Sequence, residues 1–216
     1  MSPPLRFAVL ALLGAAAAGC PGDPTAGPDA PDGGTTELRI EWAGRPEALP
    51  AAVASTATLE RAVFRLDDLR VVGDAGPIDL DHETLAWSSG IVPTPDVPAG
   101  APPGLYSRLL FKLDGDDDGS DEYAYELVGT ARVGTTTRPF TIRDRGELSV
   151  SLEFSIMLPA GATARIPVLV ELDKLVEAVD FAQAPIDDGQ FLVEGGPALD
   201  AVRAKLREAF VIRGEP

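Results

Sequence analysis

The sequence predicts a mainly β fold, an antiparallel β-sandwich of the immunoglobulin-like or Greek-key type with a C-terminal helix. Short segments alternate apolar and polar side chains, turns rich in glycine and proline separate them, and only two stretches have helical spacing. Short strands at close intervals are typical of sandwiches, whereas a parallel βαβ fold needs a helix between successive strands. We therefore expect two packed sheets rather than a doubly wound one.

The first two expected strands differ in regularity. In the first, apolar side chains alternate with charged ones over Leu38, Ile40 and Trp42. The second runs from Ala62 to Val71, but the consecutive acids Asp67 and Asp68 interrupt its period of two. Such an interruption predicts a β-bulge or a change of sheet at that point.

Four further strands are expected along the chain, over Leu105–Leu113, Tyr123–Leu127, Leu148–Ile156 and Ala164–Leu172. In the first of these, the alternate residues Leu105, Ser107, Leu109, Phe111 and Leu113 are expected on one face. The segment Leu158–Gly161 separates the last two strands, and its Pro-Ala-Gly sequence predicts a hairpin turn between them.

Helical spacing and loop composition complete the expected elements. Asp173–Val179 is expected as a short helix, and Pro197–Phe210 as a longer one that starts with proline after Gly195-Gly196. Its apolar stripe, expected to pack on the core, comprises Leu199, Val202, Leu206 and Phe210. Ser88–Gly104 is rich in proline, which predicts an irregular loop, either covering one end of the sandwich or forming the rim of a binding site.

Residues 1–19 have the features of a lipoprotein signal peptide. Arg6 precedes thirteen apolar or small residues, Phe7–Gly19, which as a helix span about 20 Å, short of the ~30 Å hydrocarbon core. The following Cys20 resembles the acylated cysteine of the bacterial lipobox, although Ala17 stands where leucine is usual. The alternative is ordinary signal cleavage. By resemblance to Gram-negative sorting, Pro21 favours the outer membrane over the inner one.

Residues 20–36 predict a tether, and residues 37–216 the β-sandwich domain. Between Pro21 and Thr36 there are four prolines, four glycines and three aspartates, but no leucine, isoleucine, valine or aromatic residue. Such a segment cannot bury apolar surface, so we expect it to act as a spacer that holds the domain away from the lipid anchor.

Composition excludes several classes of function. The 216 residues carry 18 Lys and Arg against 34 Asp and Glu, a net charge of −16, which argues against nucleic acid and anionic membrane surfaces as partners. A single cysteine excludes an internal disulfide, and a single histidine excludes a centre of several histidines. Beyond the membrane anchor, the expected partner is an envelope protein or polysaccharide.

The loop after the Leu105–Leu113 strand has half of a calcium-binding pattern. Side chains that carry oxygen occupy every second position of this loop, on both sides of a glycine. Hard cations such as calcium bind oxygen ligands with this spacing. The expected ligands are Asp114, Asp116, Asp118, Ser120 and Glu122. Tyr125 stands where the closing bidentate glutamate is needed, and Glu126 is one residue late. We expect weak, structural calcium binding; the alternative is a solvated, charged hairpin tip.

We expect no enzymatic activity. His82 lies between two acids, Asp81 and Glu83, and neither a G-x-S-x-G nucleophile elbow nor a glycine-rich phosphate loop is present. The alternative is a hydrolase that acts on envelope material with His82 as its base.

The order of elements resembles the β-sandwich lipoprotein domains of unknown function found in secreting bacteria. The resemblance is carried by Pro-Gly-Leu-Tyr106, Leu127-Val-Gly-Thr-Ala, and Val170-Glu-Leu-Asp173-Lys-Leu. The tail from Val179 to Phe210 is similar to the methanobactin-associated periplasmic copper partner protein. This resemblance implies copper handling through histidine, methionine and tryptophan, for which the domain offers only His82, Met157, Trp42 and Trp87. Because Met157 is expected in the core, we predict a relative that lacks the copper site.

Overall fold

The smaller of two sheets is built around a central strand, β10. The computed structural model describes residues 36–80, 83–98, 100–115 and 123–214. The small sheet has the order β1 (Glu37–Arg45), β10 (Thr163–Glu171) and β13 (Phe210–Ile212). β1 pairs with β10 in parallel, and β13 pairs with it antiparallel. The first strand predicted from the sequence is therefore present, with a parallel neighbour that alternation does not reveal.

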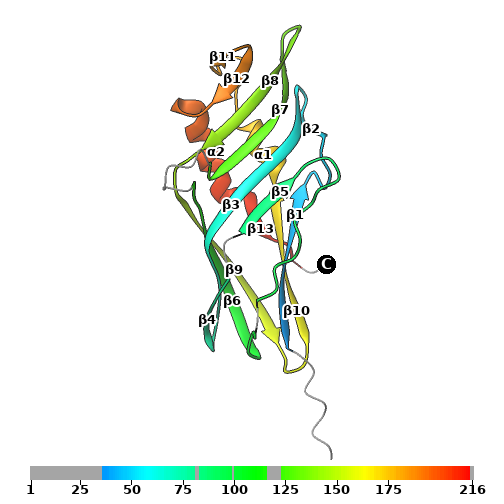
Figure 1. Cartoon of the computed structure of the whole chain (residues 1–216), viewed down its shortest axis with the longest axis vertical. Helices are drawn as coiled ribbons and strands as arrows, with labels where there is room; N and C mark the ends of the chain where they lie inside the picture. The colour runs from blue at the N-terminus through cyan, green and yellow to red at the C-terminus, as the bar shows by residue number, and fades with distance from the viewer. Residues whose placement is uncertain (1–35, 81–82, 99, 116–122, 215–216) are drawn as a thin grey trace, which may run out of the picture. The chain divides into compact units, whose positions relative to one another are not determined.

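The larger sheet has ten strands (Figure 1). Its main path is β11 (Ile186–Asp187), β12 (Gln190–Val193), β8 (Thr136–Asp144), β7 (Tyr125–Val133), β3 (Ala57–Gly73), β6 (Gly104–Leu113) and β9 (Leu148–Leu158). The strands β2 (Ala51–Ala54), β4 (Gly76–Asp79) and β5 (Glu83–Trp87) also pair with β3. All pairs in this sheet are antiparallel except β8 with β12. The predicted mainly β, sandwich-like fold with a C-terminal helix is confirmed, with a mixed rather than purely antiparallel pairing.

The long strand β3 changes partners at the predicted bulge. Its register against β6 shifts between Asp67 and Arg70, and Asp68 has a positive φ of 50°. Up to Leu66 the strand pairs with β5 and β7. Its pairing with β6 begins at Leu66, ahead of the shift, and its pairing with β4 begins at Arg70 beyond it. One extra residue in the strand breaks the period of two, so both halves present apolar side chains to the same core.

Two side chains expected in the core are on the surface instead. The register of β6 shifts between Tyr106 and Arg108 against both neighbouring strands, so Tyr106 is buried and Leu105 is 37% exposed. Met157 is 62% exposed because it alternates with Leu158, which is the buried residue at the end of β9. The expectation that Met157 belongs to the core is therefore wrong.

The predicted hairpin between β9 and β10 is also wrong. The chain does turn between them, since Ala162 N–H donates to the carbonyl of Pro159 at 3.2 Å. β9, however, is the last strand of the large sheet and β10 the centre of the small one. The segment therefore carries the chain from one sheet to the other.

The two helices and the irregular loop agree with the sequence. α1 is Leu172–Glu177, and α2 is Gly196–Ala209, with the predicted stripe of Leu199, Val202 and Leu206 buried. Phe210 is equally buried, but its backbone is extended and begins β13. In the described part of residues 88–104, which leaves out residue 99, there are only isolated bridges apart from the start of β6 at Gly104.

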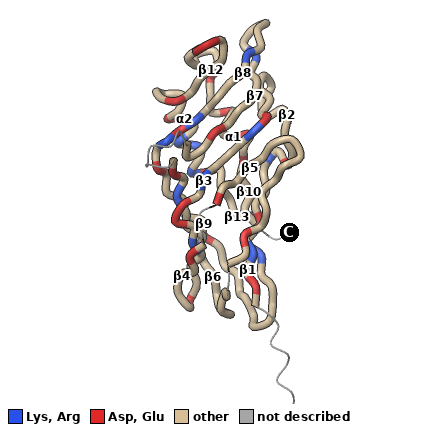
Figure 2. The backbone as a smooth tube through the Cα atoms, viewed as in Figure 1, with Lys and Arg blue, Asp and Glu red and all other residues tan. Residues whose placement is uncertain are grey.

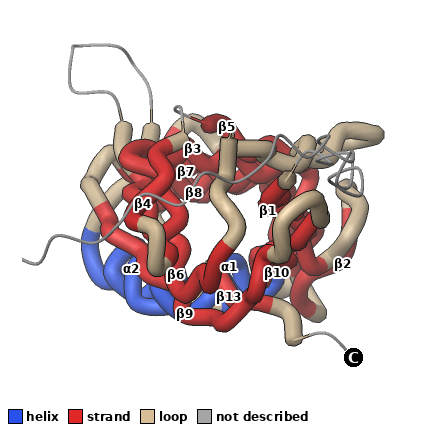
Figure 3. The backbone as a smooth tube through the Cα atoms, turned by 90° about the horizontal axis from the view of Figure 1, so that it is seen from below, coloured by secondary structure: helices blue, strands red, loops and turns tan. Residues whose placement is uncertain are grey.

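The core lies between the two sheets. Seen end-on, the strands surround a common interior, with α2 along one side (Figure 3). Residues 33–216 form one compact unit, and the described core runs from Leu38 to Phe210. This unit therefore has its own hydrophobic core and meets the criterion for an independently folding domain.

Candidate functional site

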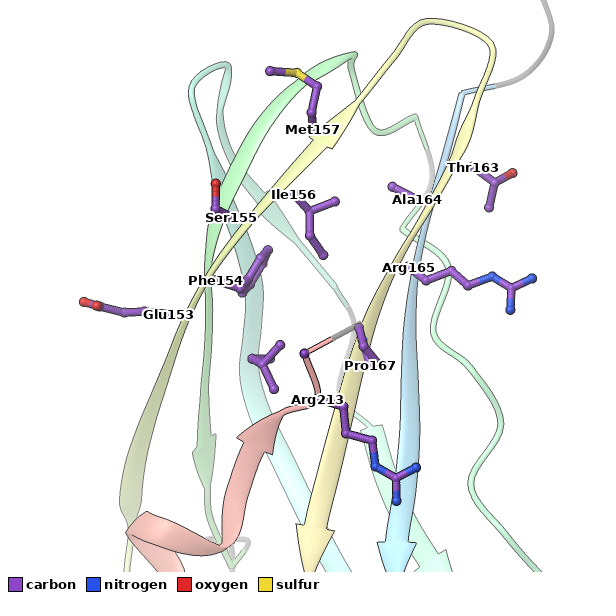
Figure 4. Close-up of a pocket in the computed structure, with 12 residues that line it drawn as sticks. Glu153, Phe154, Ser155, Ile156, Met157, Thr163, Ala164, Arg165, Pro167 and Arg213 are labelled. Atoms are coloured by element: carbon purple, nitrogen blue, oxygen red, sulfur yellow. The ribbon is translucent and has the colours of Figure 1, made fainter. Parts of the chain in front are cut away.

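A groove of about 780 Å³ opens between the two sheets (Figure 4). One wall is the end of β9, Glu153–Met157. The other is the start of β10 with Pro167, and the end of β13 with the residues that follow it, Ile212–Gly214. Residues far apart in the sequence form it.

The groove is open because no strand fills the space between β9 and the start of β10. β13 pairs with β10 only at Val168, Leu169 and Val170, and Arg213 N–H extends this contact to the carbonyl of Pro167 at 2.8 Å. Among the residues that the structure describes, β9 pairs with β6 alone in the large sheet. Between the end of β13 and the turn at residues 159–162, β9 and β10 are therefore not paired with each other.

The floor of the groove is apolar. Phe154, Ile156 and Ile212 are half-buried, and Ala164 is buried. The period of two puts Phe154 and Ile156 on the same face of β9 as the core residues Leu152 and Leu158. Figure 4 shows Ile156 pointing into the space between β9 and β10. The floor of the groove is thus a solvent-accessible continuation of the core-facing side of β9.

Charged side chains stand on its rim. Arg165 and Arg213 are exposed on the β10 side, and Glu153 is exposed on the β9 side. Arg165 lies 3.3 Å from the carboxylate of Glu41. For Arg213, no ion pair is formed with any residue that the structure describes. Elsewhere in the domain acidic and basic residues are interspersed (Figure 2), and many of the arginines and lysines contact carboxylates.

Most of the residues singled out from the sequence lie outside the described residues. These are Cys20, His82, Asp116, Asp118, Ser120 and Glu122. Asp114 is described, and its backbone N–H contacts the carbonyl of Arg65 at 3.4 Å directly after β6. Across the described ranges, no three His, Cys, Asp or Glu side chains gather as a metal site. Calcium binding by the acidic loop stays a prediction.

The structure does not bring the described copper candidates together. Trp42 is buried and donates its indole N–H to Asp96 at 2.6 Å, while Trp87 packs edge-on against Phe64 in the core. Met157 lies at the groove, whose lining contains neither tryptophan. Both tryptophans thus have structural roles in the described contacts.

Two buried carboxylates are paired with cations. Glu171 contacts Arg45 at 2.6 Å and also contacts Lys174. Burial opposes the ionisation of Asp144, but hydrogen bonds from Arg203 and from backbone N–H groups outweigh it and hold its pKa below the ordinary value. Both carboxylates are therefore held by cationic side chains in contacts within the domain.

Sequence reasoning missed the groove. The alternation through Phe154 and Ile156 predicts a strand with one face toward the core. It cannot show that no strand covers this part of that face. The one available signal was the short, proline-containing link after Leu158, which we interpreted as a hairpin.

Comparison with known proteins found no matching family model, no matching curated protein and no matching solved structure. Neither helix in the described part of the chain is long and apolar enough to span a membrane.

Proposed function

We propose that this protein is a non-enzymatic lipoprotein of the cell envelope whose β-domain is a binding module. Acyl chains on Cys20 would anchor it to the outer membrane, and residues 20–36 would tether the domain. The observation that carries the proposal is the apolar groove between the sheets, at the end of the domain where the tether joins.

The junction with the tether supports this arrangement. The hydroxyl of Thr36 accepts a hydrogen bond from Gly161 N–H at 2.9 Å, and Glu37 N–H donates to the carbonyl of Ala162 at 2.9 Å. The Gly161 N–H and the Ala162 carbonyl both belong to the turn that joins β9 to β10 at the end of the groove. The groove therefore lies at the end of the domain where β1 begins.

The lining of the groove favours binding. Its apolar floor offers surface that a ligand can cover, and its rim offers a few charged groups that can orient the ligand. Small-molecule sites likewise combine apolar surface with polar groups that fix the orientation of the ligand.

Calcium binding by the acidic loop is part of the proposal. Its support is the alternating spacing of Asp114, Asp116 and Asp118, and the position of the loop between β6 and β7. A cation there would reduce the repulsion among seven acids in residues 114–126. We expect it to stabilise the domain, with no part in ligand recognition.

The anchor is tested by expressing the full chain and its Cys20→Ala variant in a Gram-negative host with labelled palmitate. We expect label and outer-membrane fractionation for the parent chain and loss of label for the variant. A Pro21→Asp variant is the matched control, because it keeps Cys20 while changing the residue that we expect to direct sorting. An unlabelled parent chain would refute the lipoprotein proposal.

A further inference from the structure

We propose that the groove between β9 and β10 binds a single-chain anionic amphiphile, such as a fatty acid. Its apolar chain would lie against Phe154, Ile156 and Ile212, and its anionic end would face Arg213. The inference rests on the proposed function, because it takes the groove to be the binding site of the tethered module.

The apolar floor calls for an apolar occupant. Phe154, Ile156 and Ile212 are only half-buried although they continue the core faces of their strands. Covering them removes apolar surface from water, which is favourable roughly in proportion to the area covered. The volume of about 780 Å³ falls within the range typical of ligand sites.

The charged residues on the rim indicate where the anionic head group of the ligand would bind. The protein has a net charge of −16, so an anion is repelled by most of its surface. Arg165 and Arg213 line the same side of the groove, and in Figure 4 both side chains extend away from β9, so a head group would meet them at the rim and not at the floor. Arg165 is already engaged by Glu41. Arg213 is therefore the better partner for a carboxylate or phosphate head group.

An extended peptide is the competing occupant, because two strand edges face the groove. The β10 edge is a poor template for strand addition. Pro167 has no N–H to donate, and its carbonyl already accepts from Arg213 N–H. Exposed Glu153 and Arg165 also flank the edges, and charges of this kind oppose strand pairing. The geometry therefore favours a flexible apolar chain.

The test is calorimetry with the chain from Cys20 onward carrying Cys20→Ser, which contains the whole described core. Saturated fatty acids of 10, 12 and 14 carbons are titrated below their micelle concentrations. We expect Kd to fall about fourfold for each added methylene, since each buried methylene contributes ~0.8 kcal/mol. Lack of binding, or an affinity independent of chain length, would overturn the proposal.

Three variants locate the site. We expect Ile156→Gln to weaken dodecanoate binding at least tenfold, and Leu105→Gln, on the exposed face of the neighbouring strand, to leave it unchanged. Arg213→Gln should weaken dodecanoate about two- to fivefold while leaving dodecanol unchanged, because only the acid meets the guanidinium. Melting curves check that each variant is folded. Equal binding by folded Ile156→Gln and parent would place the ligand elsewhere and refute the inference.

A photo-crosslinking residue in place of Phe154, on the groove-facing side of β9, separates lipid from peptide in cells when it is introduced into the full chain. Crosslinks to a lipid agree with the inference, whereas crosslinks to a polypeptide alone would assign the groove to strand addition and overturn it. Failure of amphiphile binding with Cys20 acylated would refute this inference only. Absence of acylation would instead refute the proposed function.

Discussion

Arg203 on α2 donates two hydrogen bonds to the carboxylate of Asp144 on β8, at 2.6 and 2.7 Å. The Asp144 side chain is 6% exposed, and Gly146 N–H donates to the same carboxylate at 2.9 Å. This two-point contact fixes the helix against β8 of the large sheet. Because α2 continues directly into β13 at Phe210, the pair also helps to place the strand that bounds the groove.

The Asp144 pair predicts a loss of stability in acid. The pKa of Asp144 is lowered by folding, so its contribution is present above the unfolded pKa of about 3.9 and is lost as the pH falls through the lower folded value. Urea unfolding between pH 7 and 2.5 should show this loss. Asp144→Asn should cost about 1–3 kcal/mol at pH 7 and show a smaller loss on acidification. Equal pH dependence in the two proteins would contradict the role of Asp144.

Phe64 is expected to be a major contributor to the core. It is fully buried and its ring contacts Trp87, Tyr125 and Phe210, with ring centroids 5.7 to 6.2 Å apart. Phe64→Ala should lower the free energy of unfolding by about 3–5 kcal/mol in urea. Leu105→Ala removes a partly exposed apolar side chain and serves as the control, with a much smaller loss. A small loss for Phe64→Ala would mean that the aromatic cluster is not packed as described.

Gly129 on β7 is expected to tolerate no side chain. A Cβ there would lie 2.1 Å from the carbonyl oxygen of Thr58 and 2.9 Å from the ring of Phe140. Because one of these atoms is backbone in the adjacent strand, Gly129→Ala should destabilise the domain by about 1–3 kcal/mol. Gly195→Ala is the matched control, since its Cβ would meet no atom within 4 Å and its backbone is extended. Equal melting temperatures for the two variants would refute this prediction.

Calcium is expected to raise the melting temperature of the chain from Cys20 onward. Calcium at 100 times its Kd contributes ~2.7 kcal/mol, which corresponds to roughly 5–10 °C for a domain of this size. Asp116→Asn should abolish the rise. Asp200→Asn on α2, which removes an exposed acid of the same kind, should not. A rise that persists in Asp116→Asn would place the cation elsewhere. No rise would leave the loop a charged connection between β6 and β7, which pair with β3 on either side and do not form the expected hairpin.

Much of the fold was predictable because its longer strands alternate regularly. Alternation identified β1, β6, β9 and β10, and the acids at Asp67 and Asp68 marked the bulge in β3. The short strands were missed because two to five residues are too few to establish a period. The register shift after Tyr106 was missed because an apolar residue occupies either face of β6 there.

The sequence by itself determined the mainly β class, the two helices and the candidate anchor and cation residues, because each depends on local composition or spacing. Only the tertiary structure decided which strands are neighbours. The parallel pairing of β1 with β10 and the crossing of the chain from one sheet to the other after Leu158 depend on packing between distant segments. The groove exists because those distant segments leave one position between β9 and β10 without a strand, and side-chain periodicity within a strand contains no information about what lies beside it.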